Sequence, residues 1–405
     1  MALANYQKIT RVQTNQPFGS GADGALTISA DATQSLTVES CSGTSGSTTL
    51  TTAGTTLSNG DLILIHQTRG TGVGQWEINK VSSGGGTTTL ILQVALNYTY
   101  TDSGASQAQA IKIPQYTNIT VDSTKTWTSQ SWDGNIGGIL IAAANGTIDI
   151  NGAVSCNSAG FLKATSQAGA GTSGIAGSAN YTGEGGAGAS TNQNAANGNG
   201  GGGGLAEGTD ANSKNSSGGG GGGNGTAGTQ LNERGSDTPQ SPTQAGGGGG
   251  ATSGAADLTT MVFGGAGGNS GRNQNGGTAG SLGGDGAGII FLFGKTFDPS
   301  GGTMTAIGDN GSTSNTGGGG GGAGGSVLIQ CTTATLGTNL ITATASSGGA
   351  QGLYGGGGGA GGVGIIAIHY GTSYTGTTNP TLSVTEDTSL IEGIIGDEIT
   401  DYLFV

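Results

Sequence analysis

The chain has 405 residues, of which 91 are glycine, about 22% against a usual level of roughly 7%. Only 9% of the residues are charged and the formal net charge is −13, which excludes the highly charged composition typical of disordered tails. The 6 prolines exclude collagen, which needs abundant proline beside its regularly spaced glycine. The composition therefore predicts a glycine-rich, acidic, mainly β chain with a structural or binding role, and no enzymatic reaction can be read from it.

The charge pattern and the apolar runs narrow the choice of partner. Lys and Arg form no block, so we expect no nucleic-acid partner, because phosphate binding needs clustered cations. The longest apolar runs, 288–294 and 62–65, are far shorter than the ~20 residues that span a bilayer, and we expect no membrane insertion. The first residues lack a signal-peptide pattern, which predicts assembly in a cytoplasm. Widely spaced cysteines predict buried, unpaired thiols rather than a zinc site: Cys41, Cys156 and Cys331.

Residues 1–135 are expected to form an N-terminal β domain. Short alternating or β-branched runs recur there at roughly the 8 to 12 residue spacing of strands in a sandwich or barrel. The large side chains Trp76, Trp127 and Trp132 all fall in this part and supply core area. We predict an antiparallel β-sandwich or barrel-like domain that can fold alone and that serves in anchoring or oligomerisation.

Residues 136–376 form a glycine-rich body with an imperfect internal repeat. Four segments open with small residues and continue into an apolar strand, and the first three then enter a second alternating strand: 137–160, 287–311, 324–349 and 361–376. A repeated strand pair predicts units stacked on copies of themselves, because no single copy buries its own apolar face.

Pure glycine runs separate these segments and begin at Gly200, Gly218, Gly246, Gly317 and Gly355. One interpretation is a set of flexible linkers. The other is packing, because extended glycine can adopt the threefold helix of polyproline II and still has an N–H to donate to a neighbour. We favour packing, since the runs are pure glycine and lie beside the strands of a repeat. The predicted fold class is thus mainly β, an antiparallel N-terminal domain followed by a repeated strand-pair body with packed polyglycine II-type helices.

The last segment, residues 377–405, has no Lys or Arg and interleaves acidic residues with Leu, Ile, Phe and Val. An acidic tail usually stays solvated, but one this apolar favours burial. We expect a strand or short helix that docks on the body or on a neighbouring subunit.

Several stretches carry a family resemblance: GDLILIHQTRGTGVGQWEINKV at 60–81, TDSGASQAQAIKIPQYTNITV at 101–121, TWTSQSWDGNIGGILIAAANGTIDINGAVSC at 126–156 and GGGGGAGGVGIIAIHYGTSYTGTTNP at 355–380. They resemble a glycine-rich protein type found among bacteriophage structural proteins and bacterial surface proteins. The glycine runs are similar in kind to those of phage tail-fibre adhesins, whose tips pack polyglycine II helices. The resemblance covers roughly residues 60–376 and implies a virion or surface component that contacts a host.

The sequence matches nucleotide-binding and metal-binding motifs only poorly. The stretch 288–296 ends in Gly-Lys-Thr, but five residues separate its two glycines where a P-loop has four, so we expect no phosphate site. Loop carboxylates leave a calcium interpretation open at Asp285, Asp298 or Asp309. Our prediction is nevertheless a protein without a metal site and without a cofactor.

The histidines give little support for catalysis. His66 and His369 each lie inside a strand-like run, where a satisfied structural histidine is the usual finding. No partners for a zinc site or a Ser-His-Asp arrangement are grouped nearby. We predict that the protein is not an enzyme, with a polysaccharide depolymerase acting through paired carboxylates as a weaker alternative.

Long polar inserts lie between the glycine runs, at 205–217, 224–245 and 251–275. Recognition residues concentrate on loops held by a scaffold, so a rigid glycine core would suit the display of these inserts to a host glycan or outer-surface protein. A plain soluble surface explains the same composition. The candidate receptor contacts are Tyr181, Arg234, Arg272 and Tyr354.

These observations favour a non-enzymatic bacteriophage virion protein of fibre or decoration type, assembled in the host cytoplasm. It would form a homo-oligomer, either a trimer or a fibre, with other virion proteins as partners. The alternative is a self-assembling extracellular filament or surface-layer subunit in which residues 377–405 exchange as a strand with the next protomer.

Overall fold

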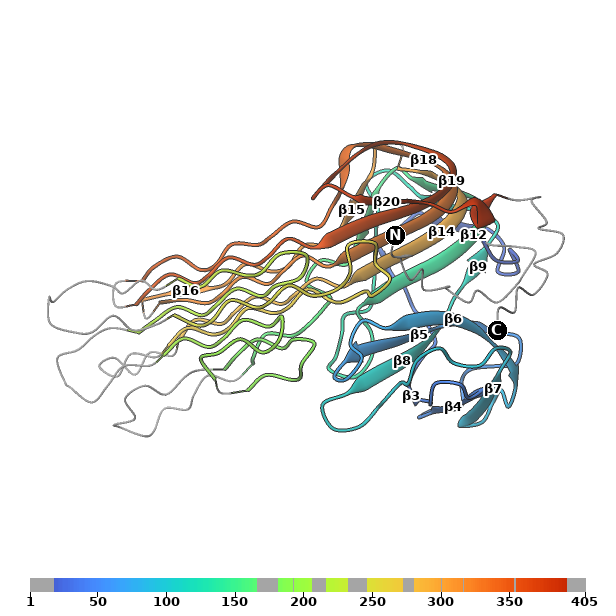
Figure 1. Ribbon diagram of the computed structural model, residues 1–405. Helices are drawn as coiled ribbons and strands as arrows, with labels where there is room; N and C mark the ends of the chain where they lie inside the picture. Colours follow the sequence, from blue (N-terminus) through green and yellow to red (C-terminus); the bar gives the residue numbers. More distant parts are fainter. Residues whose placement is uncertain are drawn as a thin grey trace, which may run out of the picture.

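The computed structural model describes residues 18–165, 181–191, 193–205, 216–231, 246–271, 280–299, 301–315, 317–352 and 355–391. Three parts can be followed in Figure 1: a closed barrel, a large parallel sheet beside it, and a bundle of extended glycine-rich segments that projects from one end of the sheet. The described residues are almost entirely strand or extended chain, so the predicted mainly β class is confirmed.

The barrel is antiparallel and closes in the strand order β3-β4-β7-β6-β5-β8. Its strands are β3 (Val38–Ser42), β4 (Thr49–Thr52), β5 (Leu62–Arg69), β6 (Trp76–Ser83), β7 (Thr89–Leu92) and β8 (Gln107–Lys112). In β4 and β7 exposed and buried residues alternate strictly, as expected for strands with one wet face. The inward side chains form the barrel's own core around Leu50, Ile65 and Tyr100.

The second sheet is parallel. Its main path runs β1-β10-β12-β14-β18-β15-β13-β11-β2, and β9, β19 and β20 pair off this path. The strands on the N-terminal side are β1 (Leu26–Ile28), β2 (Ala32–Thr33), β9 (Gln115–Tyr116), β10 (Ile119–Val121), β11 (Thr126–Thr128), β12 (Ile139–Ile150) and β13 (Ala153–Ser155). The others are β14 (Ile289–Asp298), β15 (Thr303–Thr305), β18 (Ser326–Thr342), β19 (Ile365–Asn379) and β20 (Ser383–Glu386). The short strands β16 (Thr313–Ser314) and β17 (Gly317–Gly318) pair only with each other.

The four segments of the internal repeat pair with one another in register. Ile139 of β12 lies opposite Ile289 of β14, which lies opposite Ser326 of β18, which lies opposite Ile365 of β19. The first residues of these strands are buried on both faces, which explains their unbroken apolar runs. One face packs in the sheet's own core and the other faces the barrel.

The structure differs from the sequence-based expectation in how the first 135 residues pair. The antiparallel barrel takes residues 38–112, whereas β1, β2, β9, β10 and β11 join the parallel sheet. An alternating pattern indicates a strand but does not indicate its partner, because parallel and antiparallel edges can present the same side chains. Trp76 and Trp132 accordingly lie in a core shared with Phe291 of β14, and Trp127 lies in the core of the parallel sheet.

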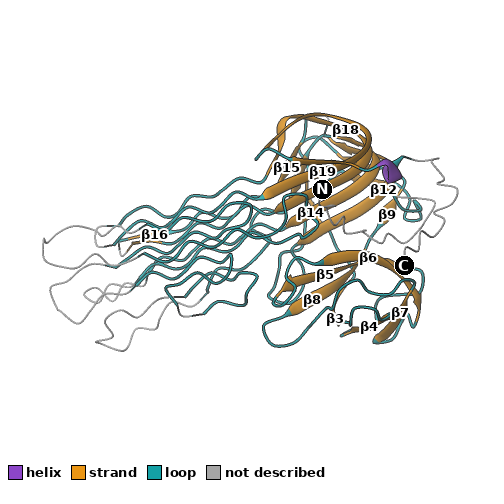
Figure 2. Ribbon diagram, viewed as in Figure 1, coloured by secondary structure: helices purple, strands orange, loops and turns teal. Residues whose placement is uncertain are grey.

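The glycine-rich segments form a hydrogen-bonded lattice, which we call the glycine rod; Figure 2 draws it as loops between the sheet and the free end. Segment 264–271 is buried, and its successive N–H groups donate in turn to three different neighbours. Gly264 and Gly267 donate to segment 281–287, Gly265 and Gly268 to segment 217–223, and Ala266 and Asn269 to segment 181–184, with N···O distances of 2.9–3.0 Å. A partner that recurs every third residue is the property of a threefold helix such as polyproline II.

The segment that precedes β18 repeats this pattern. Of its N–H groups, Gly318, Gly321 and Gly324 donate to the segment before β19, at Gly356, Gly359 and Gly362. Two or three residues later the same two segments continue as paired strands of the sheet, at Ser326 and Ile365. The glycine rod is therefore a continuation of the parallel sheet in which threefold hydrogen bonding replaces the strand ladder, and these glycine runs are not loose linkers.

The described part of the C-terminal segment lies against β19. Strand β20 pairs with β19 in parallel, and the following 3₁₀ turn η1 (Thr388–Leu390) buries Leu390. Residues 392–405 lie outside the described residues.

The three cysteines are buried and free, as predicted, and burial raises the pKa of Cys156 and of Cys331 to about 12. Within the described ranges, no helix has the length and apolar character needed to cross a membrane.

Candidate functional site

The chain crosses the free end of the glycine rod many times. Four pairs of residues there border segments outside the described ranges: Leu205 with Ser216, Leu231 with Gly246, Gly271 with Gly280, and Gly352 with Gly355. In Figure 1 the bundle of glycine-rich segments ends far from the sheet, near the label of β16.

Hydrogen bonds tie the flanking residues together. Ser217 donates its N–H to the carbonyl of Leu205 at 3.1 Å, and Gly271 donates to the carbonyl of Ser217 at 2.7 Å. Ser216 forms a β-bridge with Gly355, and the Ser281 hydroxyl donates to the carbonyl of Gly317 at 2.6 Å. Leu205, Ser216, Gly271 and Gly355 therefore lie close together.

Neighbouring segments of the glycine rod lie so close together that their backbones are in contact. A Cβ added at Gly218 would lie 1.9 Å from the carbonyl oxygen of Gly357, and one added at Gly268 would lie 2.0 Å from the carbonyl oxygen of Gly202. Real Cβ atoms do not approach backbone oxygens this closely, so the rod accepts no side chain at these positions. Buried asparagines add side-chain hydrogen bonds, for example from Asn199 Nδ2 to the carbonyls of Gly223 and Phe263 at 3.1 and 3.0 Å.

The predicted receptor contacts are only partly described. Tyr181 is partly buried at the side of the rod, where its carbonyl accepts the N–H of Asn269 at 3.0 Å. Arg234, Arg272 and Tyr354 lie outside the described residues.

The insert 251–275, expected as a display loop, has a different place in its described part, 251–271. Leu258, Met261 and Phe263 are buried against the barrel. The indole Nε1 of Trp76 donates to the carbonyl of Leu258 at 2.9 Å. The run LTTMVF within the insert is apolar enough to favour burial, and the prediction of a display loop did not take this run into account.

A buried ion pair joins the barrel to the rod, and the sequence analysis missed it. Arg69, at the end of β5, pairs with Glu184 of segment 181–184, with side chains 8% and 4% exposed. The other carboxylate oxygen of Glu184 accepts from the Leu162 N–H at 2.9 Å and from Trp132 Nε1 at 3.1 Å. Burial raises the pKa of Glu184, although the Leu162 N–H and the Arg69 charge oppose the rise. The only sequence signal was a lone glutamate in a glycine-rich stretch.

His66 also lies at this junction and is structural, as expected. One ring nitrogen, Nε2, lies 2.8 Å from the Met261 carbonyl, which only accepts, so Nε2 carries the proton. The other, Nδ1, lies 2.9 Å from the Thr68 hydroxyl. Burial lowers the pKa of His66 to about 4. His369 also has a ring nitrogen beside a backbone carbonyl: its Nε2 lies 3.1 Å from the carbonyl oxygen of Asp257.

Two of the three carboxylates considered for calcium, Asp285 and Asp309, are engaged with a lysine, and Asp298 lies apart from them at the end of β14. Lys163 Nζ lies 2.7 Å from Asp285 Oδ2 and 3.8 Å from Asp309 Oδ2. Asp285 Oδ1 also accepts the Lys163 N–H at 2.7 Å, and Asp309 Oδ1 accepts the Ser158 hydroxyl at 2.6 Å. This arrangement is an ion-pair cluster, and within the described residues no three His, Cys, Asp or Glu side chains group as metal ligands.

Comparison with known proteins gives little. No protein-family model matches the chain, and no curated protein matches it. Among solved structures, it is aligned with the Gp54 tailspike of Acinetobacter baumannii bacteriophage AP22, in complex with A. baumannii capsular saccharide, at 10% identity and a TM-score of 0.20. The match covers 90% of this chain and 61% of the tailspike, so the chain spans about three-fifths of that protein's length. A TM-score this low carries no argument about fold or function.

Proposed function

We propose that this chain is a structural protein of a bacteriophage particle, of fibre or decoration type, whose segments at the free end of the glycine rod attach to the host surface. The observation that carries the proposal is the convergence of the flanking residues at one end of a hydrogen-bonded rod. Binding residues gain affinity when a scaffold holds them in place, because less conformational freedom is lost on binding.

The contact between the barrel and the glycine rod supports separate roles for the two parts, anchoring for the barrel and binding for the free end of the rod. The ion pair between Arg69 and Glu184, with both side chains almost fully buried, holds the rod at a fixed place on the barrel. Removing one partner of such a pair leaves a buried charge and typically costs about 3–5 kcal/mol. The barrel would then serve as the attachment point in a homo-oligomer or to other virion proteins, with the free end of the rod pointing outward.

The test replaces residues 206–215 and 232–245 with glycine-serine sequences of equal length and measures binding of the labelled protein to host cells. We expect the fraction of protein bound to fall at least tenfold, with an unchanged melting temperature. The control changes the exposed barrel residues Thr87 and Thr88 to serine and should bind as the parent does. Binding by the double-loop variant equal to that of the parent would refute attachment through the rod end. Absence of the chain from purified particles, as measured by mass spectrometry of their proteins, would refute the virion assignment.

A further inference from the structure

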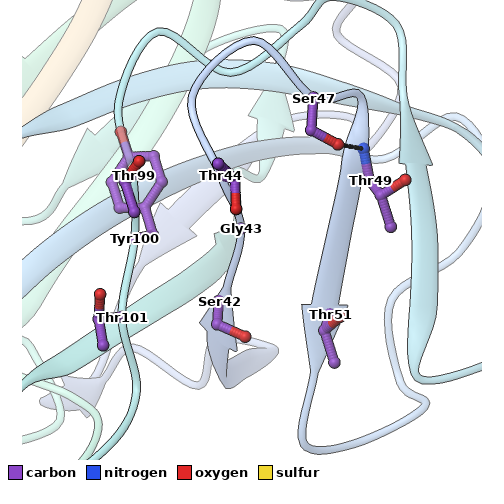
Figure 3. Close-up of a pocket in the computed structure, with 9 residues that line it drawn as sticks. All are labelled: Ser42, Gly43, Thr44, Ser47, Thr49, Thr51, Thr99, Tyr100 and Thr101. Atoms are coloured by element: carbon purple, nitrogen blue, oxygen red, sulfur yellow. Dashed lines mark hydrogen bonds between the residues drawn. The ribbon is translucent and has the colours of Figure 1, made fainter.

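A cleft of about 400 Å³ lies on the outer surface of the barrel, on strands that do not carry the glycine rod (Figures 1 and 3). Three neighbouring pieces of chain form it: the end of β3 with the residues after it, β4, and residues 99–101. Most of its lining consists of serine and threonine side chains, namely Ser42, Thr44, Ser47, Thr49, Thr51, Thr99 and Thr101.

Strand alternation places these hydroxyls on one face. Ser42 lies directly opposite Thr51 on β4, and Gly43 and Tyr100 exchange backbone hydrogen bonds of 3.0 and 2.8 Å. Leu50 and Tyr100 are 0% and 2% exposed and point into the barrel, so the residues on either side of each must point outward. The result is a set of hydroxyls on one face of three neighbouring pieces of chain, as Figure 3 shows.

The rim of the cleft is fixed without a ligand. The N–H of Gly46 donates to the Leu96 carbonyl at 2.8 Å, and the N–H of Leu96 donates to the Ser47 carbonyl at 2.9 Å. The Ser45 hydroxyl donates to the carbonyl of Asn97 at 2.9 Å. These bonds tie the two bordering loops together, so a ligand would meet a pre-formed surface and lose less free energy in ordering it.

The lining has no acidic or basic side chain. A charged ligand would lose water there without gaining an opposite charge, and an apolar ligand would leave the hydroxyls without partners. Each hydroxyl can donate one hydrogen bond and accept two, so the complementary ligand is uncharged and carries closely spaced groups that both donate and accept. We propose that this cleft binds a neutral saccharide.

The inference goes beyond the proposed function because it gives the barrel a ligand of its own, independent of the segments at the rod end. A single cleft of this kind binds weakly, with a Kd of about 1 mM for a mono- or disaccharide. Several copies on one particle would raise the overall avidity roughly 10²- to 10⁴-fold if they engage the same surface.

The test titrates the full chain, labelled with ¹³C in its threonine methyl groups, with glucose, galactose, N-acetylglucosamine, maltose and lactose. The expected result is a saturable shift of the Thr99 and Thr101 methyl resonances with at least one of them. The variant T44V/T49V/T51V keeps shape and β-branching but removes three hydroxyls. It should bind that sugar at least tenfold more weakly.

Two controls make the result decisive. The variant T27V/T89V changes exposed threonines outside the cleft and should bind as the parent does. Glucuronic acid should leave the cleft resonances unchanged. Absence of shifts with every neutral sugar, at tenfold above about 1 mM, would overturn the proposal. So would equal binding by the T44V/T49V/T51V variant. A chain with the replaced rod-end segments should keep the shifts, so failure of this test and failure of the attachment test are distinguishable.

Discussion

His66 shows how a single buried side chain links the barrel to the rod. Gln109 Nε2 donates to the Thr68 hydroxyl at 2.9 Å, which leaves that hydroxyl free to donate to His66 Nδ1, while Nε2 of the ring donates to Met261. The chain of donors requires the neutral ring, because a protonated Nδ1 could no longer accept from Thr68.

This requirement predicts an acid-sensitive stability. The folded-state pKa of His66, about 4, lies below its ordinary value of 6.5, so between these pH values the unfolded chain binds a proton that the folded chain does not. The contribution of His66 to the free energy of unfolding should be complete above pH 6.5 and fall by about 3 kcal/mol as the pH drops to about 4. Urea unfolding of the parent and of His66→Gln at several pH values in this window measures it. Identical pH dependence in the two proteins would show that the ring is not held neutral.

The glycine segments fold as elements because they lack side chains. Gly268→Ala would place a Cβ 2.0 Å from the carbonyl oxygen of Gly202, and both groups belong to buried, hydrogen-bonded backbone. We expect a loss of unfolding free energy of about 3 kcal/mol or more, the upper end of overpacking costs. Gly46→Ala is the control: no atom lies within 4 Å of the added Cβ, and its φ of +83° should cost only about 1–2 kcal/mol. Chemical denaturation followed by tryptophan fluorescence compares the two variants, and equal losses would contradict close packing.

Strands were easier to predict than their partners. The period-2 pattern of β4 and the apolar runs of β14, β18 and β19 indicated strands, and the repeat indicated stacked copies. The parallel pairing of β1 with β10 could not be predicted, because partner choice depends on how the distant chain closes. Glycine runs have no side-chain pattern, so packing could be favoured over linkers only because the runs are pure glycine and lie beside the strands of a repeat, and the neighbours of each run could not be predicted.

The candidate sites divide in the same way. Polar inserts between glycine runs indicated display, and the described flanking residues do gather at one end. The pairing of Arg69 with Glu184 joins residues 115 positions apart, a contact that no local pattern encodes. The hydroxyl cleft combines Ser42 of β3, Thr51 of β4 and Thr99 of a connecting segment. In the sequence these serine and threonine residues have no distinguishing pattern, because only closure of the barrel brings them together.

The whole molecule is one continuous structure in which the barrel, the parallel sheet and the glycine rod share cores and backbone hydrogen bonds. Trp76 of the barrel packs edge-on against Phe291 of the sheet, with ring centroids 5.2 Å apart. Trp132 does the same with Phe263, at the start of a rod segment, at 5.6 Å. The orientation of the free end relative to the barrel is therefore set by packing, which is what a display scaffold requires.

Hydrogen exchange of the backbone amides, read by mass spectrometry, tests the central claim that the glycine rod is an ordered, hydrogen-bonded body. Because nearly every N–H of segments 264–271 and 318–325 donates to a neighbouring carbonyl, both should exchange as slowly as the buried strands β5 and β14. The exposed turn 103–105, whose N–H groups donate no hydrogen bond in the described structure, gives the fast reference. Complete exchange of both glycine segments at the rate of that turn, with β5 and β14 still protected, would mean that the runs are flexible linkers and that no rod exists.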